Sequence, residues 1–292
     1  MAFHPSELIL NPDGSIYHLN LLPEDIADTI FFVGDPSRVK RVSRHFDKIH
    51  VRKQKREFIT HTGELNGKLL TVISTGIGTD NIDIVINELD ALVNIDLESR
   101  VEKPEKKQLT FIRIGTSGGI HESVEVDRFV KSAYGIGMDG LGVFYGPQPL
   151  EEVQILENDF HRQVTGPAGL PRIYAAKGTP SLIDEAFPGF ITGMTLTATG
   201  FYGPQGRSIR LPNKMAGTFD LIHDFTFRGL NCTNLEMETA AIYLLSDLLG
   251  HRALSCNVIL ANRKLGTFST HPKESVNRLI SSVLDHFASA AL

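Results

Sequence analysis

The chain has 292 residues and a net charge of −5, from 29 basic and 34 acidic side chains. A content of 41% hydrophobic and 22% charged residues is typical of a globular protein that builds its own core. The acidic balance argues against a nucleic-acid binder, and a few arginines would still suffice for small anionic ligands. With two cysteines, no signal-peptide pattern and no apolar run of membrane-span length, we expect a cytoplasmic protein that does not bind membranes.

Apolar runs alternate with helical patterns along the chain. The sequence predicts strands at 29–34, 69–75, 109–115, 194–200 and 253–262, and helices at 81–95, 234–250 and 275–292, with another helix beginning at Pro36. Near-continuous apolar strands between helices indicate a sheet covered on both faces, an α/β layered fold. In such folds ligands bind at the carboxyl ends of strands, so we expect the chemistry there.

One composition shift interrupts this pattern. Residues 97–108 hold seven charges and one proline between two apolar segments. We expect a charged surface loop and not a linker between domains, because a strand pattern resumes directly afterwards. The whole chain, 1–292, is therefore predicted to be a single domain, with residues 1–28 as an N-terminal arm.

Two predicted strand ends carry residues suited to an anion. Gly34 precedes a helix that begins at Pro36, and Arg38 lies in its first turn, where free N–H groups attract negative charge. Arg113 lies inside an apolar strand and is followed by Thr116, Ser117 and three glycines. An arginine beside hydroxyls and open backbone is typical of a phosphate site. A plain strand–helix turn and a structural arginine–carboxylate pair remain the alternatives.

Two further segments suit a nucleoside. Glu236 and Glu238 flank Met237 at the expected start of a helix, where carboxylates can bind the two hydroxyls of a ribose or simply face the helix dipole. Gln205 and Arg207 follow Phe201 on a Gly/Pro-rich loop. They can present an amide and a guanidinium to a planar heterocycle on which Phe201 stacks, unless the segment is an ordinary surface loop.

Other patterns are set aside. Residues 135–140 match G-x-G-x-x-G, but no helical pattern follows, which argues against dinucleotide binding. The eleven histidines are scattered without metal-ligand spacing, so we expect no metal site.

Six motifs in order resemble the nucleoside phosphorylase-I family, and within it the members that act on uridine. The motifs are YHLNL, VGDPSRV, KREF, STGIG, RIGTSGG and LEMET, and the similarity runs from about Tyr17 to the C-terminal helix. The resemblance implies a single layered domain with a mixed central β-sheet flanked by helices. It also implies reversible phosphorolysis of uridine, with deoxyuridine or thymidine as further substrates, to uracil and α-ribose 1-phosphate in pyrimidine salvage.

The resemblance also implies a role for each candidate residue. Phosphate would be bound by Gly34, Arg38, Arg113 and Thr116, and by Arg56 from a neighbouring subunit. Ribose would be bound by Glu236, Met237 and Glu238, and by His18 from that neighbour. The base would be bound by Phe201, Gln205, Arg207, Ser117, Gly118 and Arg263. Arg113, Glu238, Gln205 and Arg207 would be catalytic.

The implied partners are a nucleoside, inorganic phosphate as co-substrate and a second copy of the chain, in a homodimer with shared sites or a hexamer of such dimers. No cofactor is implied, and a monovalent cation at Glu57 is doubtful because Asn81 stands where a serine is expected. Relatives that act on purines would carry an aspartate after the late strand, where this chain has Asn262 and Arg263. The alternatives are a purine nucleoside phosphorylase, a nucleoside hydrolase and a non-catalytic nucleoside-binding protein.

Overall fold

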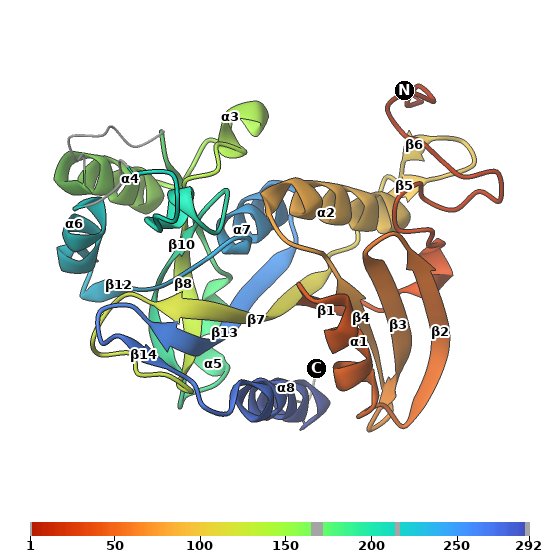
Figure 1. The fold of residues 1–292 in the computed structure, drawn as a ribbon. Coiled ribbons are helices and arrows are strands. Elements are labelled where there is room, and N and C mark those ends of the chain that lie inside the picture. The colour runs from red at the N-terminus through yellow and green to blue at the C-terminus, as the bar shows by residue number, and fades with distance from the viewer. Residues whose placement is uncertain (1, 165–171, 214–216, 290–292) are drawn as a thin grey trace.

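A computed structural model describes residues 2–164, 172–213 and 217–289, and one large mixed sheet runs through it (Figure 1). Its strands are β1 (Thr29–Val33), β2 (Lys48–Lys55), β3 (Phe58–Leu65), β4 (Lys68–Ser74), β7 (Thr110–Gly119), β8 (Phe129–Gly137), β9 (Tyr174–Lys177), β10 (Ile191–Thr197), β11 (Thr226–Phe227), β12 (Leu230–Glu236), β13 (Arg252–Asn262) and β14 (Thr267–Phe268). The order is β11-β12-β10-β8-β13-β7-β1-β4-β3-β2, with β9 on β8 and β14 on β13. The predicted α/β fold with a mixed central sheet is confirmed.

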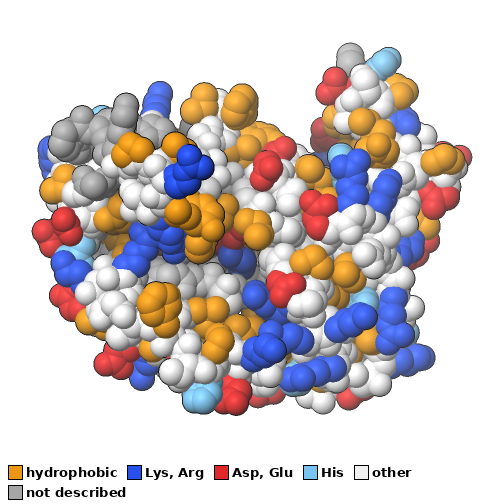
Figure 2. Space-filling view, in the orientation of Figure 1, with side chains coloured by type: hydrophobic (Ala, Val, Ile, Leu, Met, Phe, Trp, Pro, Cys, Tyr) orange, Lys and Arg blue, Asp and Glu red, His pale blue; other side chains and the backbone are white. Residues whose placement is uncertain are grey.

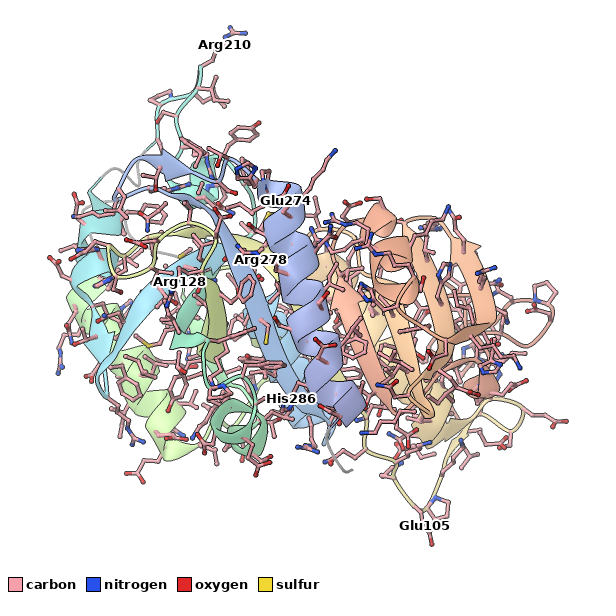
Figure 3. All side chains as sticks on the ribbon, turned by 90° about the horizontal axis from the view of Figure 1, so that it is seen from below. Glu105, Arg128, Arg210, Glu274, Arg278 and His286 are labelled. Carbon is pink, nitrogen blue, oxygen red and sulfur yellow. The ribbon has the colours of Figure 1, made fainter. Side chains whose placement is uncertain are left out.

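The helices are α1 (Pro36–Ser43), α2 (Thr79–Asn94), α3 (Gly142–Tyr145), α4 (Glu151–Val164), α5 (Pro180–Glu185), α6 (Thr218–Asp224), α7 (Thr239–Leu248) and α8 (Pro272–Ser289), with single 3₁₀ turns η1 (Pro23–Asp25) and η2 (Gly203–Gln205). Helices α1 and α8 cover one face of the sheet, and α2 and α7 cover the other (Figures 1 and 3). The predicted helix at 275–292 corresponds to α8, and its last three residues lie outside the described part of the chain.

Alternation along the strands explains why both faces are apolar. In β1, Phe31 and Val33 belong to the core under α1 and α8, whereas Ile30 and Phe32 belong to the core under α2 and α7. The same alternation in β7 places Arg113 on the α2/α7 face. A charged side chain therefore points into an otherwise apolar layer and needs partners there.

Two predicted element boundaries are wrong. The strand expected to end in a turn at Gly115 continues to Gly119, because β13 pairs along its length and Gly118 also pairs with Leu235 of β12. Gly115 makes room for the Arg113 side chain: a Cβ there would lie 2.9 Å from Arg113 Cζ.

The helix expected over 234–250 is a strand followed by a helix. Residues up to Glu236 belong to β12, and α7 begins only at Thr239. The change of direction is stabilised by Glu236, whose carboxylate accepts hydrogen bonds from the backbone N–H groups of Glu238 and Thr239 at 3.0 Å. Helix α7 ends as predicted before Gly250, which has a φ of +76°.

The N-terminal arm and the charged segment lie together at one end of the molecule. A two-stranded sheet pairs β5 (Ile95–Asp96), just before the charged segment, with β6 (Val101–Glu102) inside it. Backbone N–H of Phe3 donates to the carbonyl of Arg100, and the Arg100 guanidinium donates to the carbonyl of Leu8. Glu105 lies at the tip of this loop, directed away from the sheet (Figure 3). No described helix is long and apolar enough to cross a membrane.

Candidate active site

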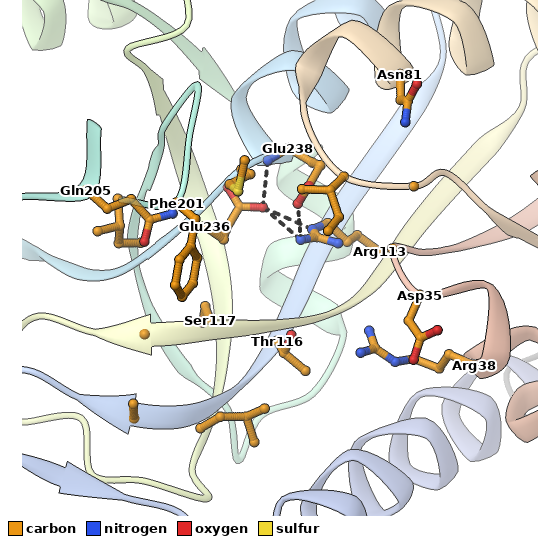
Figure 4. A pocket seen from close by; sticks show the side chains of 18 of the residues that line it. Asp35, Arg38, Asn81, Arg113, Thr116, Ser117, Phe201, Gln205, Glu236 and Glu238 are labelled. Carbon is orange, nitrogen blue, oxygen red and sulfur yellow. Dashed lines mark hydrogen bonds and ion pairs between the residues drawn. The ribbon is translucent and has the colours of Figure 1, made fainter. Parts of the chain in front are cut away.

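A pocket of about 970 Å³ opens at the carboxyl ends of β1, β4 and β12 (Figure 4) and forms the hollow in the middle of the face in Figure 2. Parallel strands end on the same edge of a sheet, so the motifs that follow them meet there. Twelve of the fifteen predicted site residues line it: Gly34, Arg38, Arg113, Thr116, Ser117, Gly118, Phe201, Gln205, Arg207, Glu236, Met237 and Glu238. His18, Arg56 and Arg263 are not among the lining residues.

One end of the pocket is suited to an anion. Asp35 caps α1 by accepting a hydrogen bond from the Ser37 backbone N–H at 2.8 Å. The backbone of Gly34 passes so close to Gly76 that a Cβ atom on residue 34 would lie 3.2 Å from the Gly76 carbonyl oxygen. Arg38 is 8% exposed, and its Nη1 donates to the carbonyl of Ile114 at 3.1 Å. Burial, with the charge of Arg113 second, lowers the pKa of Arg38 to about 10, so the side chain stays positive at neutral pH.

Arg113 is held between two carboxylates of the β12–α7 turn (Figure 4). Its Nε donates to Glu236 at 3.0 Å, and its Nη2 donates to Glu238; all three side chains are nearly inaccessible to solvent. Burial lowers the pKa of Arg113, but the two carboxylates outweigh this and raise it. Burial raises the pKa of Glu238, against the opposing effect of Arg113.

The two carboxylates have different surroundings. Glu236 also accepts from the Thr197 hydroxyl at 2.8 Å and from two backbone N–H groups, so its oxygens are fully occupied within the fold. Glu238 accepts from the Gly78 backbone N–H at 2.8 Å and from Arg113, which leaves it lone pairs for a ligand hydroxyl. Of the two, Glu238 is therefore the one placed to bind a sugar.

The other end of the pocket carries the amide and guanidinium pair. Arg207 Nη1 donates to Gln205 Oε1 at 2.6 Å, and the Arg207 guanidinium lies 3.8 Å from the Phe201 ring centroid. Gln205 is buried and Phe201 is half exposed. Because Arg207 fixes the amide orientation, Nε2 and one Oε1 lone pair of Gln205 remain for a ligand.

A chain of buried polar groups reaches Ser117 in the middle of the pocket. Asn234 Nδ2 donates to Ser117 Oγ at 3.0 Å, while its Oδ1 accepts from Thr195 at 2.8 Å. Ser117 Oγ already accepts one hydrogen bond, so its own proton is free to donate into the pocket.

Three predicted residues lie outside the pocket of their own chain. His18 is bound to α2: Glu88 accepts from its backbone N–H at 3.0 Å and contacts its Nδ1 at 2.6 Å. Arg56 is exposed in the β2–β3 turn, directly beside Glu57, which does line the pocket. Arg263 supports the base end from behind, because its guanidinium donates to the Gln205 carbonyl and its backbone N–H to Gly119 at 3.0 Å.

Sequence reasoning missed two apolar residues at the pocket mouth. Phe268 is 76% exposed on β14, and Ile77 is 68% exposed just before α2. Ile77 lies within the STGIG motif, which could have pointed to it. Phe268 carries no such signal, because only the β13–β14 pairing returns it to the pocket.

Glu57 and Asn81 both line the pocket, and Asn81 Nδ2 faces Glu57 Oε1 at 3.3 Å. In this orientation the amide donates to Glu57, and a cation at Glu57 would need Oδ1 of Asn81 turned toward it instead.

Comparison with known proteins finds nucleoside phosphorylases that match over most of this chain. The uridine phosphorylase of Thermococcus kodakarensis is 30% identical over 88% of this chain and 80% of its own. A DeoD-type purine nucleoside phosphorylase of Listeria monocytogenes is 28% identical over 82% of this chain and 83% of its own. A crystal structure of a Trypanosoma brucei nucleoside phosphorylase, described as showing uridine phosphorylase activity, superposes with a TM-score of 0.87 at 29% identity, over 97% of this chain and all of that one. The sequence profile of the phosphorylase superfamily matches residues 28–289, and the chain belongs to this family.

Proposed function

We propose that this chain is a uridine phosphorylase, which cleaves uridine with inorganic phosphate to uracil and α-ribose 1-phosphate. One continuous pocket combines an anion-binding end, the Glu238 carboxylate with lone pairs left for a ligand, and a base end with paired amide and guanidinium groups. Relatives named as uridine phosphorylases support the same substrate.

The base end carries the preference for a pyrimidine. The described residues that line it are Ser117, Gly118, Phe201, Gln205, Arg207, Leu260, Ala261 and Phe268, and none of them is a carboxylic acid. A purine leaving group is assisted by an acid that protonates its N7, and the described residues of this end include no such carboxylic acid. Uracil leaves as an anion, and the Gln205 amide and the Arg207 guanidinium can donate to its oxygens.

The other end positions phosphate for attack on the anomeric carbon. Arg38, Arg113 and the Thr116 hydroxyl surround the anion, and Glu238 binds the ribose hydroxyls with Met237 against the sugar. Holding the two substrates in line contributes about 7–11 kcal/mol to lowering the barrier. The C–N bond breaks as the phosphate oxygen bonds to carbon from the opposite face, so the anomeric centre inverts.

Charge balance supports a site completed by a second subunit. The positive charges of Arg38 and Arg113 are matched by Glu236 and Glu238, and two more carboxylates, Asp35 and Glu57, also line the pocket. A phosphate dianion therefore needs further positive charge there. Arg56 is exposed beside the pocket-lining Glu57, so it can point outward into the pocket of another copy.

We propose a homodimer with two-fold symmetry as the smallest assembly, because each copy then gives and receives the same residues. The arm that carries His18 packs on α2, and α3 next to it exposes Val143 (68%) and Phe144 (85%). Hydrophobic side chains gather at the top of Figure 2, where Figure 1 places α3, and such exposed apolar side chains suit burial against a second copy. A hexamer of such dimers would keep the same shared sites.

Complementation tests the shared site. We would mix inactive Arg56→Ala chains with inactive Glu238→Ala chains under conditions of subunit exchange. The matched control is Arg52→Ala, which removes an exposed arginine on β2. Shared sites predict recovered activity, because some sites receive a native Arg56 and a native Glu238. Absence of recovery after verified exchange, or a fully active monomer by sedimentation, contradicts the proposal.

The substrate assignment is tested with a panel of nucleosides. Phosphate-dependent cleavage of uridine, thymidine, 2′-deoxyuridine, inosine and adenosine should be measured side by side. We expect uridine to have the highest kcat/KM, with activity on deoxyuridine or thymidine. Faster cleavage of inosine than of uridine would contradict the pyrimidine assignment.

We also propose that residues 1–292 act as one domain, with the 1–28 arm and the 97–108 loop as appendages, in a cytoplasmic enzyme of pyrimidine salvage. The single sheet that joins β2 to β11 supports one folding unit. Limited proteolysis is expected to cut the 97–108 loop without separating the rest of the chain.

A further inference from the structure

Three potential metal ligands come together outside the set of residues that line the pocket. His121 and Glu122 follow β7, and His223 lies in α6, which packs on the same side of the molecule in Figure 1. One ligand atom from each of these three residues lies within 4.8 Å of the other two. The two imidazole rings are nearly parallel, with centroids 4.9 Å apart.

The hydrogen bonds of His223 leave one nitrogen directed at a carboxylate. Nδ1 lies 3.2 Å from the Ile120 carbonyl and donates to it. Nε2 is then an acceptor, yet it faces Glu122 Oε2 at 3.1 Å and Asp224 Oδ1 at 3.9 Å. Acceptors that face one another need a proton or a cation between them. A histidine that donates one N–H to a carbonyl and presents its other nitrogen is typical of a metal ligand.

His121 is arranged differently, because its Nδ1 accepts a hydrogen bond from the Ser123 backbone N–H at 3.1 Å. Ser123 Oγ lies 2.7 Å from His121 Nδ1 and can accept the Nδ1 proton when Nε2 binds a metal. In that tautomer the Ser123 backbone N–H loses its acceptor, and because Ser123 is exposed the group can donate to water instead. Both rings can therefore offer Nε2 without burying an unpaired group.

We propose that His121, Glu122 and His223 bind a divalent zinc ion, with Asp224 or water as the fourth ligand. Two imidazoles and a carboxylate are an established donor set for tetrahedral zinc. Zinc–ligand distances of about 2.0–2.2 Å place ligand atoms about 3.5 Å apart. Glu122 is 53% exposed, and its side chain can move to close the remaining separation.

The site would join two segments that support the base end of the pocket. The loop of His121 is held by Asn262, which donates to the His121 carbonyl at 2.9 Å, next to Arg263. The segment that carries His223, α6, packs its Phe219 ring on Gly206. The contact is so close that a Cβ atom on residue 206 would lie 2.5 Å from the ring. A metal bridging His121 and His223 would therefore hold α6 and the loop of residues 201–207 in place.

Zinc titration of the metal-free full chain tests this proposal. Calorimetry in phosphate-free buffer should give one zinc ion per chain, and Co²⁺ in place of zinc should give the absorption bands of a tetrahedral site. His223→Gln and His121→Gln should each weaken zinc binding at least about tenfold. His271→Gln, at an exposed histidine on the loop before α8, is the matched control and should bind zinc like the unaltered chain.

The measurements distinguish a loss of zinc binding from a loss of folding. Unaltered thermal midpoints of the metal-free variants would show that the folds are intact. If the unaltered chain does not bind zinc at 100 times the protein concentration, or if His223→Gln binds it equally well, the proposal is wrong and His223 forms an imidazolium–carboxylate pair only. Binding without tetrahedral Co²⁺ bands would also overturn the donor set. These results do not depend on catalysis, so they stand apart from the proposed uridine phosphorylase activity.

Discussion

Replacing Arg113 with methionine should affect stability and catalysis by separable routes. Methionine retains most of the side-chain volume but leaves Glu236 and Glu238 buried without their counter-charge. Breaking a buried ion pair by removing one partner costs about 3–5 kcal/mol in free energy of unfolding. Urea denaturation at pH 8 should show a loss of this size.

The loss should depend on pH, with a sign that follows from burial. Without Arg113, the effect of burial on Glu238 is unopposed, and the pKa of this carboxyl in the folded state rises further above its unfolded value. The protonated form then favours the fold, so this stability is fully present below the unfolded pKa and disappears as the pH rises through the folded pKa. The difference between Arg113→Met and the unaltered chain should therefore be smaller at pH 5 than at pH 8.

A triple variant separates the two roles of Arg113. Arg113→Met combined with Glu236→Gln and Glu238→Gln removes all three charges and should regain most of the lost stability. It should not regain activity, because the developing charge on phosphate still lacks a donor worth about 3–4 kcal/mol, or more than a hundredfold in kcat. If Arg113→Met is as stable as the unaltered chain at pH 8, or retains near-normal phosphorolysis, this reasoning is refuted.

The remaining predictions concern the base end and the arm. Gln205→Ala should lower kcat/KM for uridine by about a hundredfold while the phosphate KM changes little, because the lost contacts are to the base. Phe201→Ala should raise the uridine KM about tenfold through loss of stacking on a half-exposed ring, and an unchanged KM would count against stacking. Glu88→Gln should weaken the contact that holds His18 and raise the uridine KM several-fold. The control Glu64→Gln alters the exposed pair of Glu64 with His50 and should leave the uridine KM unchanged.

Much of the fold could be predicted because strand alternation and helix periodicity are local signals. The strand at 29–34 and the helix from Pro36 correspond to β1 and α1. The extension of β7 to Gly119 could not be predicted, because glycines favour turns and only pairing with β12 and β13 keeps this segment extended. The strand–helix junction at Glu236 was hidden because its apolar spacing also fits a helix.

The site was predictable where residues of one motif converge at a strand end. Arg113, Glu238 and Gln205 carry side chains that are costly to bury without a function or a partner, and all three line the pocket. The Arg113–Glu236–Glu238 arrangement links two motifs more than 100 residues apart, so the sequence alone left a structural ion pair open as an alternative. His121 and His223 likewise show no spacing that would mark them as neighbours, and only the packing of α6 brings them together.

The most direct test of the central claim is the dependence of uracil release on phosphate. Purified protein should be incubated with uridine, with and without inorganic phosphate, while uracil is followed by absorbance and sugar phosphate by ³¹P NMR. The account predicts one α-ribose 1-phosphate per uracil and negligible release without phosphate. Equal uracil release without phosphate, with free ribose as the product, would contradict it and indicate a hydrolase.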